Sequence, residues 1–207
     1  TKGNEVTVVG GKFGNALQFS GSNTNSRVSF GTDSRKNFDG VFSVSLWIKR
    51  TSNSGTQYIL GNKSGSNNPG YYFRMSSNNN KRFTVKGTTQ ERNRDVVNAW
   101  NAQSWHHIVN VFNANALSTG MRWRIYADGV QKDQNAITKI ETASANLRIG
   151  ERSWGSGNRF IGLLDDLRYY DRDLSGSEVA ALYGNGNGDF VTVRTGNSAS
   201  IKKAGTV

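Results

Sequence analysis

The sequence predicts an all-β fold, either a sandwich or a barrel. Short segments alternate apolar and polar residues, which is the period of a half-buried strand. Clusters of Asn, Ser and Gly separate these segments, and the chain has 24 glycines but only 1 proline. The length of 207 residues suits a single domain, since all-β domains often run to about 200–250 residues.

The alternating segments follow one another along the chain. The clearest is residues 42–49, in which Phe42, Val44, Leu46 and Ile48 are separated by less apolar neighbours. Residues 121–126 lead into an Asp-Gly pair at 128–129, a strong hairpin signal. The other predicted strands are residues 16–20, 28–30, 57–60, 71–75, 82–85, 107–112, 147–149 and 160–170.

One segment predicts a short C-terminal helix. Ser175 and Glu178 have the spacing of a capping box, and Gly184 stands where a C-cap glycine belongs. The buried stripe of this helix would consist of Val179, Leu182 and Tyr183. Residues 1–184 are therefore predicted to form the β-domain, and residues 185–207 a glycine-rich hinge and a basic tail.

Composition excludes several function classes. The chain has no cysteine, so it can form neither a disulfide nor a thiolate metal site. No apolar stretch is long enough to span a membrane. The net charge of +11 predicts attraction to an anionic partner, such as a nucleic acid, an anionic polysaccharide or an acidic protein. Since the basic residues are scattered and no nucleic-acid-binding motif accompanies them, we expect no dedicated nucleic-acid binding.

Several segments in order carry motifs of a known family. They are Gly-Asn-Ala-Leu-Gln-Phe at 14–19, residues 42–49, Trp-His-His-Ile-Val at 105–109, Tyr-Ala-Asp-Gly at 126–129, and residues 147–150, 160–170 and 174–183. Together, over about residues 10–184, they resemble the laminin-G-like jelly-roll family of the concanavalin-A-like lectin/glucanase superfamily. The resemblance implies a two-sheet antiparallel β-sandwich (jelly roll) with one short C-terminal helix and with loops along one rim. It names no ligand, because one fold hosts many functions.

The superfamily includes glycosidases, which need two carboxylates flanking the scissile bond. Glucanases of this fold place them on one strand as Glu-x-Asp-x-x-Glu, and no glutamate of this chain lies in such a pattern. Asp165 and Asp166 are adjacent, so a regular strand would point them to opposite faces, and the same holds for His106 and His107. No nucleophile elbow is present either. We therefore predict that the chain is not an enzyme.

The resemblance also raises the question of a structural calcium ion. Members of the family often hold Ca²⁺ with oxygen ligands near the first and penultimate strands, and Asp165 or Asp166 could contribute here. The family commonly has an acidic residue where this chain has Ser20. In the alternative, Asp166 pairs with Arg168 or accepts hydrogen bonds from a loop.

The loop at residues 151–159 is the predicted ligand-binding segment. It places Trp154 between Arg152 and Arg159, so that the indole could stack on a sugar ring while the guanidiniums bind a sulfate or carboxylate. Residues 67–72, which include Tyr71 and Tyr72, and the nearby Arg74 could extend the same surface. In the alternative, Trp154 is buried under the edge of the sandwich and the arginines only solvate the surface.

Two functions are compatible with these features. The first is a non-catalytic binding or adhesion module that recognises a carbohydrate or glycoprotein, preferably anionic, in an extracellular or cell-surface setting. The second is a structural or decoration subunit of a virion or extracellular assembly, in which the charge complements an acidic protein or the chain assembles with its own copies. The β-like run at residues 190–193 could supply an edge for such assembly.

Overall fold

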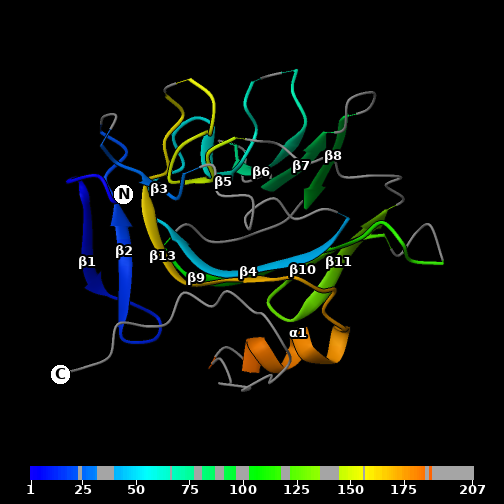
Figure 1. Ribbon diagram of the computed structural model, residues 1–207. Coiled ribbons are helices and arrows are strands. Elements are labelled where there is room, and N and C mark those ends of the chain that lie inside the picture. The colour runs from blue at the N-terminus through cyan, green and yellow to red at the C-terminus, as the bar shows by residue number, and fades with distance from the viewer. Residues whose placement is uncertain are drawn as a thin grey trace.

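The computed structural model describes residues 1–22, 25–31, 40–65, 67–76, 81–86, 91–96, 103–117, 122–135, 145–155, 157–184 and 187. Within these ranges the chain forms two antiparallel sheets and one helix, α1 (Gly176–Tyr183). Figure 1 shows the two sheets as layers, with α1 against the far side of the larger sheet. The two-sheet sandwich predicted by the sequence is confirmed.

The larger sheet has 7 strands among the described residues, and each neighbouring pair is antiparallel. In spatial order they are β1 (Val6–Gly10), β2 (Asn15–Phe19), β13 (Gly162–Tyr170), β4 (Val41–Arg50), β9 (Trp105–Asn113), β10 (Trp123–Ala127) and β11 (Val130–Asn135). The Asp-Gly pair joins β10 to β11 as the sequence predicted, and the left-handed φ of 51° at Asp128 and 75° at Gly129 suits such a turn.

The smaller sheet has 6 strands within the described ranges, again all antiparallel. Their spatial order is β3 (Val28–Ser29), β12 (Arg148–Ile149), β5 (Gln57–Gly61), β6 (Gly70–Met75), β7 (Lys81–Lys86) and β8 (Glu91–Val96). The sequence predictions missed β1 and β8, and they gave no range for β11, the second strand of the predicted hairpin. β8 reads Glu-Arg-Asn-Arg-Asp-Val, so its strand conformation follows from pairing with β7 and not from an apolar pattern of its own.

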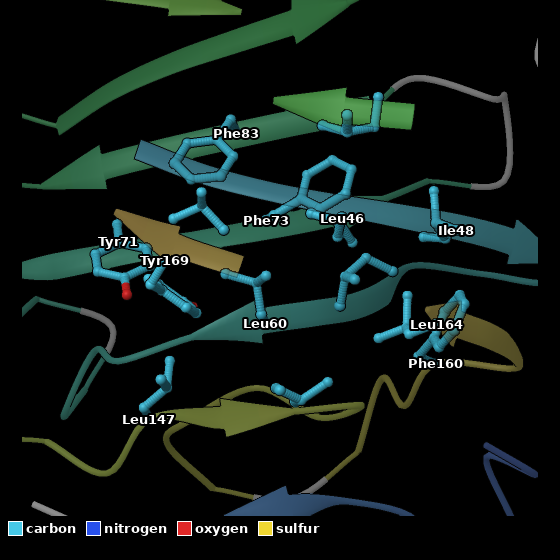
Figure 2. Packing of buried hydrophobic residues seen from close by; sticks show 14 of the residues in the cluster. Leu46, Ile48, Leu60, Tyr71, Phe73, Phe83, Leu147, Phe160, Leu164 and Tyr169 are labelled. Carbon is cyan, nitrogen blue, oxygen red and sulfur yellow. The ribbon is translucent and has the colours of Figure 1, made fainter. Parts of the chain in front are cut away.

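The hydrophobic core lies between the two sheets. In β4 the residues Phe42, Val44, Leu46 and Ile48 point into it and are each at most 1% exposed. The smaller sheet contributes a second set, which includes Leu60, Tyr71, Phe73 and Phe83 (Figure 2). In β4 the alternation in the sequence thus identified the side that faces the other sheet.

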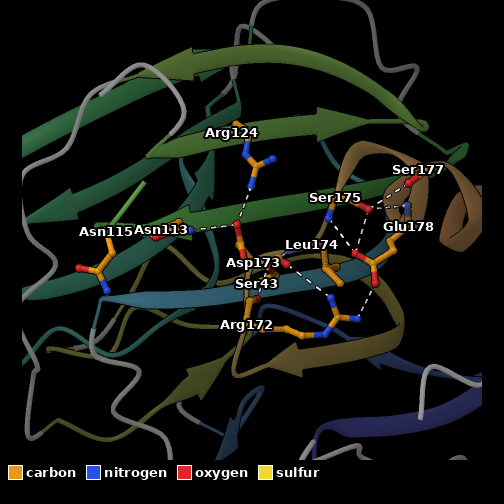
Figure 3. Close-up of polar contacts among 10 residues, drawn as sticks. All are labelled: Ser43, Asn113, Asn115, Arg124, Arg172, Asp173, Leu174, Ser175, Ser177 and Glu178. Carbon is orange, nitrogen blue, oxygen red and sulfur yellow. Dashed lines mark hydrogen bonds and ion pairs between the residues drawn. The ribbon is translucent and has the colours of Figure 1, made fainter. Parts of the chain in front are cut away.

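A second apolar cluster joins α1 to the outer face of the larger sheet. It consists of Val109, Val111, Tyr126, Tyr170, Leu174, Val179 and Leu182. The predicted capping box is present, since Ser175 accepts the Glu178 amide while Glu178 accepts the Ser175 amide (Figure 3). Gly184 ends the helix with a left-handed φ of 51°. Tyr183 is only half-buried, although its ring stacks on Trp47 at 5.8 Å.

Apart from Asn187, the predicted hinge and tail at residues 185–207 lie outside the described residues, as does the run at 190–193. Within the described part of the chain, no helix is long and apolar enough to cross a membrane.

Candidate functional site

The outer face of the smaller sheet carries polar and aromatic side chains. Because Tyr71, Phe73 and Met75 point into the core, the alternate residues of β6, Tyr72 and Arg74, point outward. Residues paired across neighbouring strands lie on the same face and form two rows. In one row, Tyr72 of β6 pairs with Thr84 of β7, which pairs with Asn93 of β8. In the other row, Arg74 of β6 lies between Tyr58 of β5 and Arg82 of β7.

The prediction that Tyr71 contacts a ligand is therefore wrong, because its side chain points into the core and not toward the outer face. Its side chain is 1% exposed and lies in the core (Figure 2), with its ring 5.3 Å from that of Phe42 of the opposite sheet and tilted by 41°. Burial, followed by the neighbouring Tyr169, raises the pKa of Tyr71 well above its ordinary value. Tyr72, which belongs to the same predicted segment, faces the loop instead, as the alternation of residues along β6 indicates.

The loop between β12 and β13 lies against this outer face and is fixed to β5. Gly150 donates its amide to the Ile59 carbonyl at 2.8 Å, and the Ser153 hydroxyl donates to the Lys63 carbonyl at 2.6 Å. Gly150 turns the chain with φ of 86°, and a Cβ there would come within 2.3 Å of the Phe19 ring. A glycine is required at this turn for both reasons.

This loop places Trp154 among aromatic and cationic groups. The half-buried Trp154 ring meets Tyr58 edge-on at 5.5 Å and Tyr72 at 5.4 Å. The Lys63 Nζ lies 5.1 Å from the centre of the Trp154 ring and 5.3 Å from that of Tyr72. We call Tyr58, Lys63, Tyr72 and Trp154 the aromatic cluster. The sequence prediction identified Trp154, and its segment 67–72 included Tyr72, but it missed Tyr58 and Lys63, which come from β5 and the segment after it.

A charged group adjoins the aromatic cluster. Glu151 is fully buried, and its carboxylate has Arg27 Nη1 at 3.1 Å, Arg159 Nε at 3.1 Å and Arg148 Nη1 at 3.7 Å. We call these four residues the Glu151 cluster. Arg159 was predicted for the site, whereas Arg27, Arg148 and Glu151 were not, since only the fold brings residue 27 to this loop. Arg152 is half-buried in the same loop.

The predicted metal ligands lie on the other sheet. Asp165 is 9% exposed, and its two oxygens accept the backbone amides of Phe13 at 2.8 Å and Asp166 at 2.7 Å. Asp166 binds Arg168 Nε at 2.8 Å and has a left-handed φ of 47° at a bulge in β13. Among the described residues, no group of three or more His, Asp or Glu side chains could hold a metal ion. Calcium takes about 6–8 oxygen ligands, and both Asp165 oxygens and one Asp166 oxygen already accept hydrogen bonds from the protein.

Calcium therefore stays a prediction from the sequence, and it has a direct test. An ion bound only to the native state raises the melting temperature. From the donor set above, we expect EDTA and millimolar CaCl₂ to leave the melting temperature unchanged within about 1 °C. A drop in EDTA that CaCl₂ reverses would contradict this expectation and establish a structural site.

The histidine pair ties β9 to the β10–β11 hairpin. His106 Nδ1 lies 2.9 Å from one Asp128 oxygen, and the His107 amide donates to the other at 2.9 Å. His107 is 1% exposed, bonded to the Ser45 hydroxyl at 2.8 Å and tilted against Trp47 at 5.1 Å. Burial lowers the pKa of His107 from 6.5 to about 4, although Asp128 opposes this shift. These contacts assign the Trp-His-His and Asp-Gly motifs a shared structural role.

The glutamates whose side chains are described also have structural contacts. Glu5 accepts hydrogen bonds from Ser20 and Ser22. Glu178 completes the helix cap and binds Arg172 Nη2 at 2.7 Å, which lowers the pKa of Glu178 to about 2 (Figure 3). Glu151 faces three arginines. The side chain of Glu91 and the whole of Glu141 lie outside the described residues.

The sheets, the terminal helix and the ordered motifs define a jelly-roll β-sandwich of the lectin-like class. A model of the concanavalin A-like lectin/glucanases superfamily matches residues 20–180, so the chain belongs to this superfamily. The family resemblance predicted from the sequence is confirmed. No curated protein matches the chain by sequence.

Solved structures share this fold at low sequence identity. Domain 4 of AbnA, a GH43 extracellular arabinanase from Geobacillus stearothermophilus determined with arabinotriose, is 21% identical, with a TM-score of 0.67 over 87% of this chain and 82% of that one. The ligand-binding domain of botulinum neurotoxin serotype D, determined with N-acetylneuraminic acid, is 14% identical, with a TM-score of 0.70 over 89% of this chain and 45% of that one.

The binding domain of Paraclostridial Mosquitocidal Protein 1 is 19% identical, with a TM-score of 0.69 over 88% of this chain and 46% of that one. This chain thus spans less than half the length of the two toxin domains. Identities at this level show a common fold.

Proposed function

We propose that this chain is a non-catalytic binding module that recognises a carbohydrate or a glycoprotein glycan, preferably an acidic one, outside the cell. The observation that carries the proposal is the aromatic cluster on the outer face of the smaller sheet, flanked by arginines. A half-buried indole can stack on the apolar face of a sugar ring. Arginines beside it supply donors suited to carboxylate or sulfate.

The solved structures with this fold support the proposal, although its main basis is the aromatic cluster. One was determined with arabinotriose and another with N-acetylneuraminic acid, a neutral and an acidic sugar respectively. The arabinanase domain belongs to an extracellular protein. The net charge of +11 adds a general attraction to acidic glycans, which salt would weaken.

The structural-subunit alternative gains no specific support from the described residues. Its sequence basis, the run at 190–193 and the basic tail, lies outside them. Self-assembly and an acidic protein partner therefore stay predictions, and the oligomeric state of the intact chain in solution would test them.

Replacing Trp154 by alanine is expected to weaken glycan binding about ten-fold or more, because loss of the stacking surface removes about 1.4 kcal/mol. The measurement is titration calorimetry with oligosaccharides selected from an array of neutral, uronic and sulfated glycans. Lys132→Ala is the matched control, since Lys132 is exposed on β11 of the other sheet and its loss should leave binding unchanged.

Absence of binding across the array at low salt would overturn the proposed function. Equal affinities for Trp154→Ala and the unmodified chain would instead show that the glycan binds elsewhere on the domain.

A further inference from the structure

The charges of the Glu151 cluster do not balance. The cluster contains three positive charges, from Arg27, Arg148 and Arg159, and one negative charge, from the carboxylate of Glu151. Its net charge is therefore +2. Within the described residues, Glu151 is the one acidic group that these arginines share. Each arginine comes from a different place in the chain, namely the turn before β3, β12 and the loop before β13.

The hydrogen bonding of the cluster is also incomplete. The Nε atoms of Arg148 and Arg159 are buried without a hydrogen-bond partner among the described residues, and the Arg159–Glu151 contact lacks hydrogen-bond geometry. Each guanidinium offers five N–H donors, so the single carboxylate of Glu151 cannot satisfy all the donors of three guanidinium groups. Repulsion among poorly solvated cations disfavours the arrangement unless another anion joins it.

The guanidiniums are held firmly yet stay within reach of solvent. Glu151 is fully buried beneath them, whereas the side chains of Arg27, Arg148 and Arg159 are 34%, 20% and 15% exposed. Arg148 Nη1 is further held by the Gly155 carbonyl at 3.4 Å. Donors fixed in advance bind an anion with less loss of conformational entropy than free side chains would.

The Glu151 cluster is continuous with the aromatic cluster. Arg159 forms a parallel β-bridge with Tyr58, whose ring packs against Trp154, and the Tyr58 amide donates to the Asn158 carbonyl at 2.7 Å. On β12, Ile149 points into the core, so its neighbour Arg148 lies on the outer face of the smaller sheet, as Tyr72 does.

We propose that the Glu151 cluster is an oxyanion subsite that takes the carboxylate or sulfate group of an acidic sugar. This rests on the proposed glycan-binding function and specifies its substrate class. In this arrangement Glu151 positions the three arginines from the interior, and the acidic group of the ligand supplies the negative charge that they lack. The aromatic cluster serves the sugar ring.

The test compares an oligogalacturonate, a sulfated heparin oligosaccharide and neutral arabinotriose, all at about 150 mM salt to screen general charge attraction. We expect the unmodified chain to bind at least one acidic ligand about ten-fold more tightly than the neutral one. Arg27→Ala should abolish this preference and leave neutral binding unchanged. Lys132→Ala, which removes one positive charge from the exposed strand β11, should preserve it. Oligogalacturonate carries only carboxylates, so its binding assigns a carboxylate to the subsite. Heparin carries both groups, so binding of heparin without binding of oligogalacturonate assigns a sulfate.

Two results would overturn the subsite. Equal losses in Arg27→Ala and Lys132→Ala would show that only overall charge matters. Equal affinity for neutral and acidic ligands would remove the subsite while leaving the glycan-binding function intact. Arg27→Lys covers the case in which Arg27→Ala does not fold. It keeps the charge without the guanidinium fork, so it should lose part of the acidic preference, and full retention would count against the subsite.

An independent readout separates failure of the subsite from failure of the function. Sulfate stabilises proteins in general, and this effect should be the same in the unmodified chain and in Arg27→Ala. At equal ionic strength, the gain in melting temperature from chloride to sulfate should be larger in the unmodified chain, because bound sulfate adds to it. If no glycan binds and this difference persists, the glycan function fails and the oxyanion site stands; if the gains are equal, the site fails as well.

Discussion

Replacing Trp123 by alanine is expected to lower the free energy of unfolding by about 3–5 kcal/mol. Trp123 is fully buried and joins the two sheets, since its ring contacts Phe83 of the smaller sheet at 5.8 Å and Phe112 of the larger one at 5.5 Å. Its Nε1 donates to the Asn110 side chain at 3.4 Å, so truncation also leaves a buried acceptor without this donor. The alanine would leave a cavity where the indole was. Because both sheets border this cavity, neither sheet can collapse into it without disturbing its own strand pairing.

Urea unfolding followed by circular dichroism measures this loss. Trp154→Ala provides the comparison, since Trp154 is half-buried on the outer face and outside the main core, and its removal should cost clearly less. Equal losses for the two variants would mean that the outer aromatic cluster contributes as much to stability as the core does. The result would also show whether Trp154→Ala can be used in binding assays as a folded protein.

Acidification from pH 6.5 to pH 4 is expected to reduce the free energy of unfolding by about 3 kcal/mol through His107. Burial holds the pKa of His107 at about 4 in the folded chain against 6.5 when solvated, while Asp128 raises this pKa by a smaller amount and Arg168 lowers it further. Between these values the unfolded chain binds a proton that the folded chain does not. The contribution of His107 to the free energy of unfolding is therefore largest above pH 6.5 and decreases as the pH falls toward 4.

Urea titrations at pH 7, 5.5 and 4 measure this slope. His107→Gln removes the titrating group, so its unfolding free energy should change much less over the same range. A slope that persists undiminished in His107→Gln would assign the pH dependence to other groups. Glu178 acts in a lower window, because its pKa is lowered from 4.5 to about 2 by Arg172 and its contribution is lost only as the pH falls below 4.5.

In the proposed function, the oxyanion subsite and the aromatic cluster divide recognition between two kinds of interaction. Stacking on Trp154 would tolerate many sugars, whereas arginines fixed by a buried carboxylate would select for a negative charge. The two parts are separable by mutation, because Trp154→Ala should weaken neutral and acidic ligands alike, while Arg27→Ala should weaken only the acidic ones.

Local pattern was sufficient for much of the fold. The alternation at 42–49 identified the core face of β4, and the Ser175–Glu178 spacing with Gly184 gave both ends of α1. These features depend on side-chain periodicity and on hydrogen bonds within a few residues, which a sequence displays directly. Edge strands without an apolar pattern, such as β8, were missed because their conformation depends on a neighbouring strand.

The sequence by itself determined the superfamily, the sandwich and the loop that carries Trp154. The alternation of Tyr71, Phe73 and Met75 indicated that Tyr72 lies on the other side of its strand, but only the tertiary structure brought the Trp154 loop over that side. It alone brought Arg27 to Glu151, 124 residues further along the chain. Charge balance around a buried carboxylate depends on distances of a few ångströms, and the fold sets these distances between segments that the sequence keeps far apart.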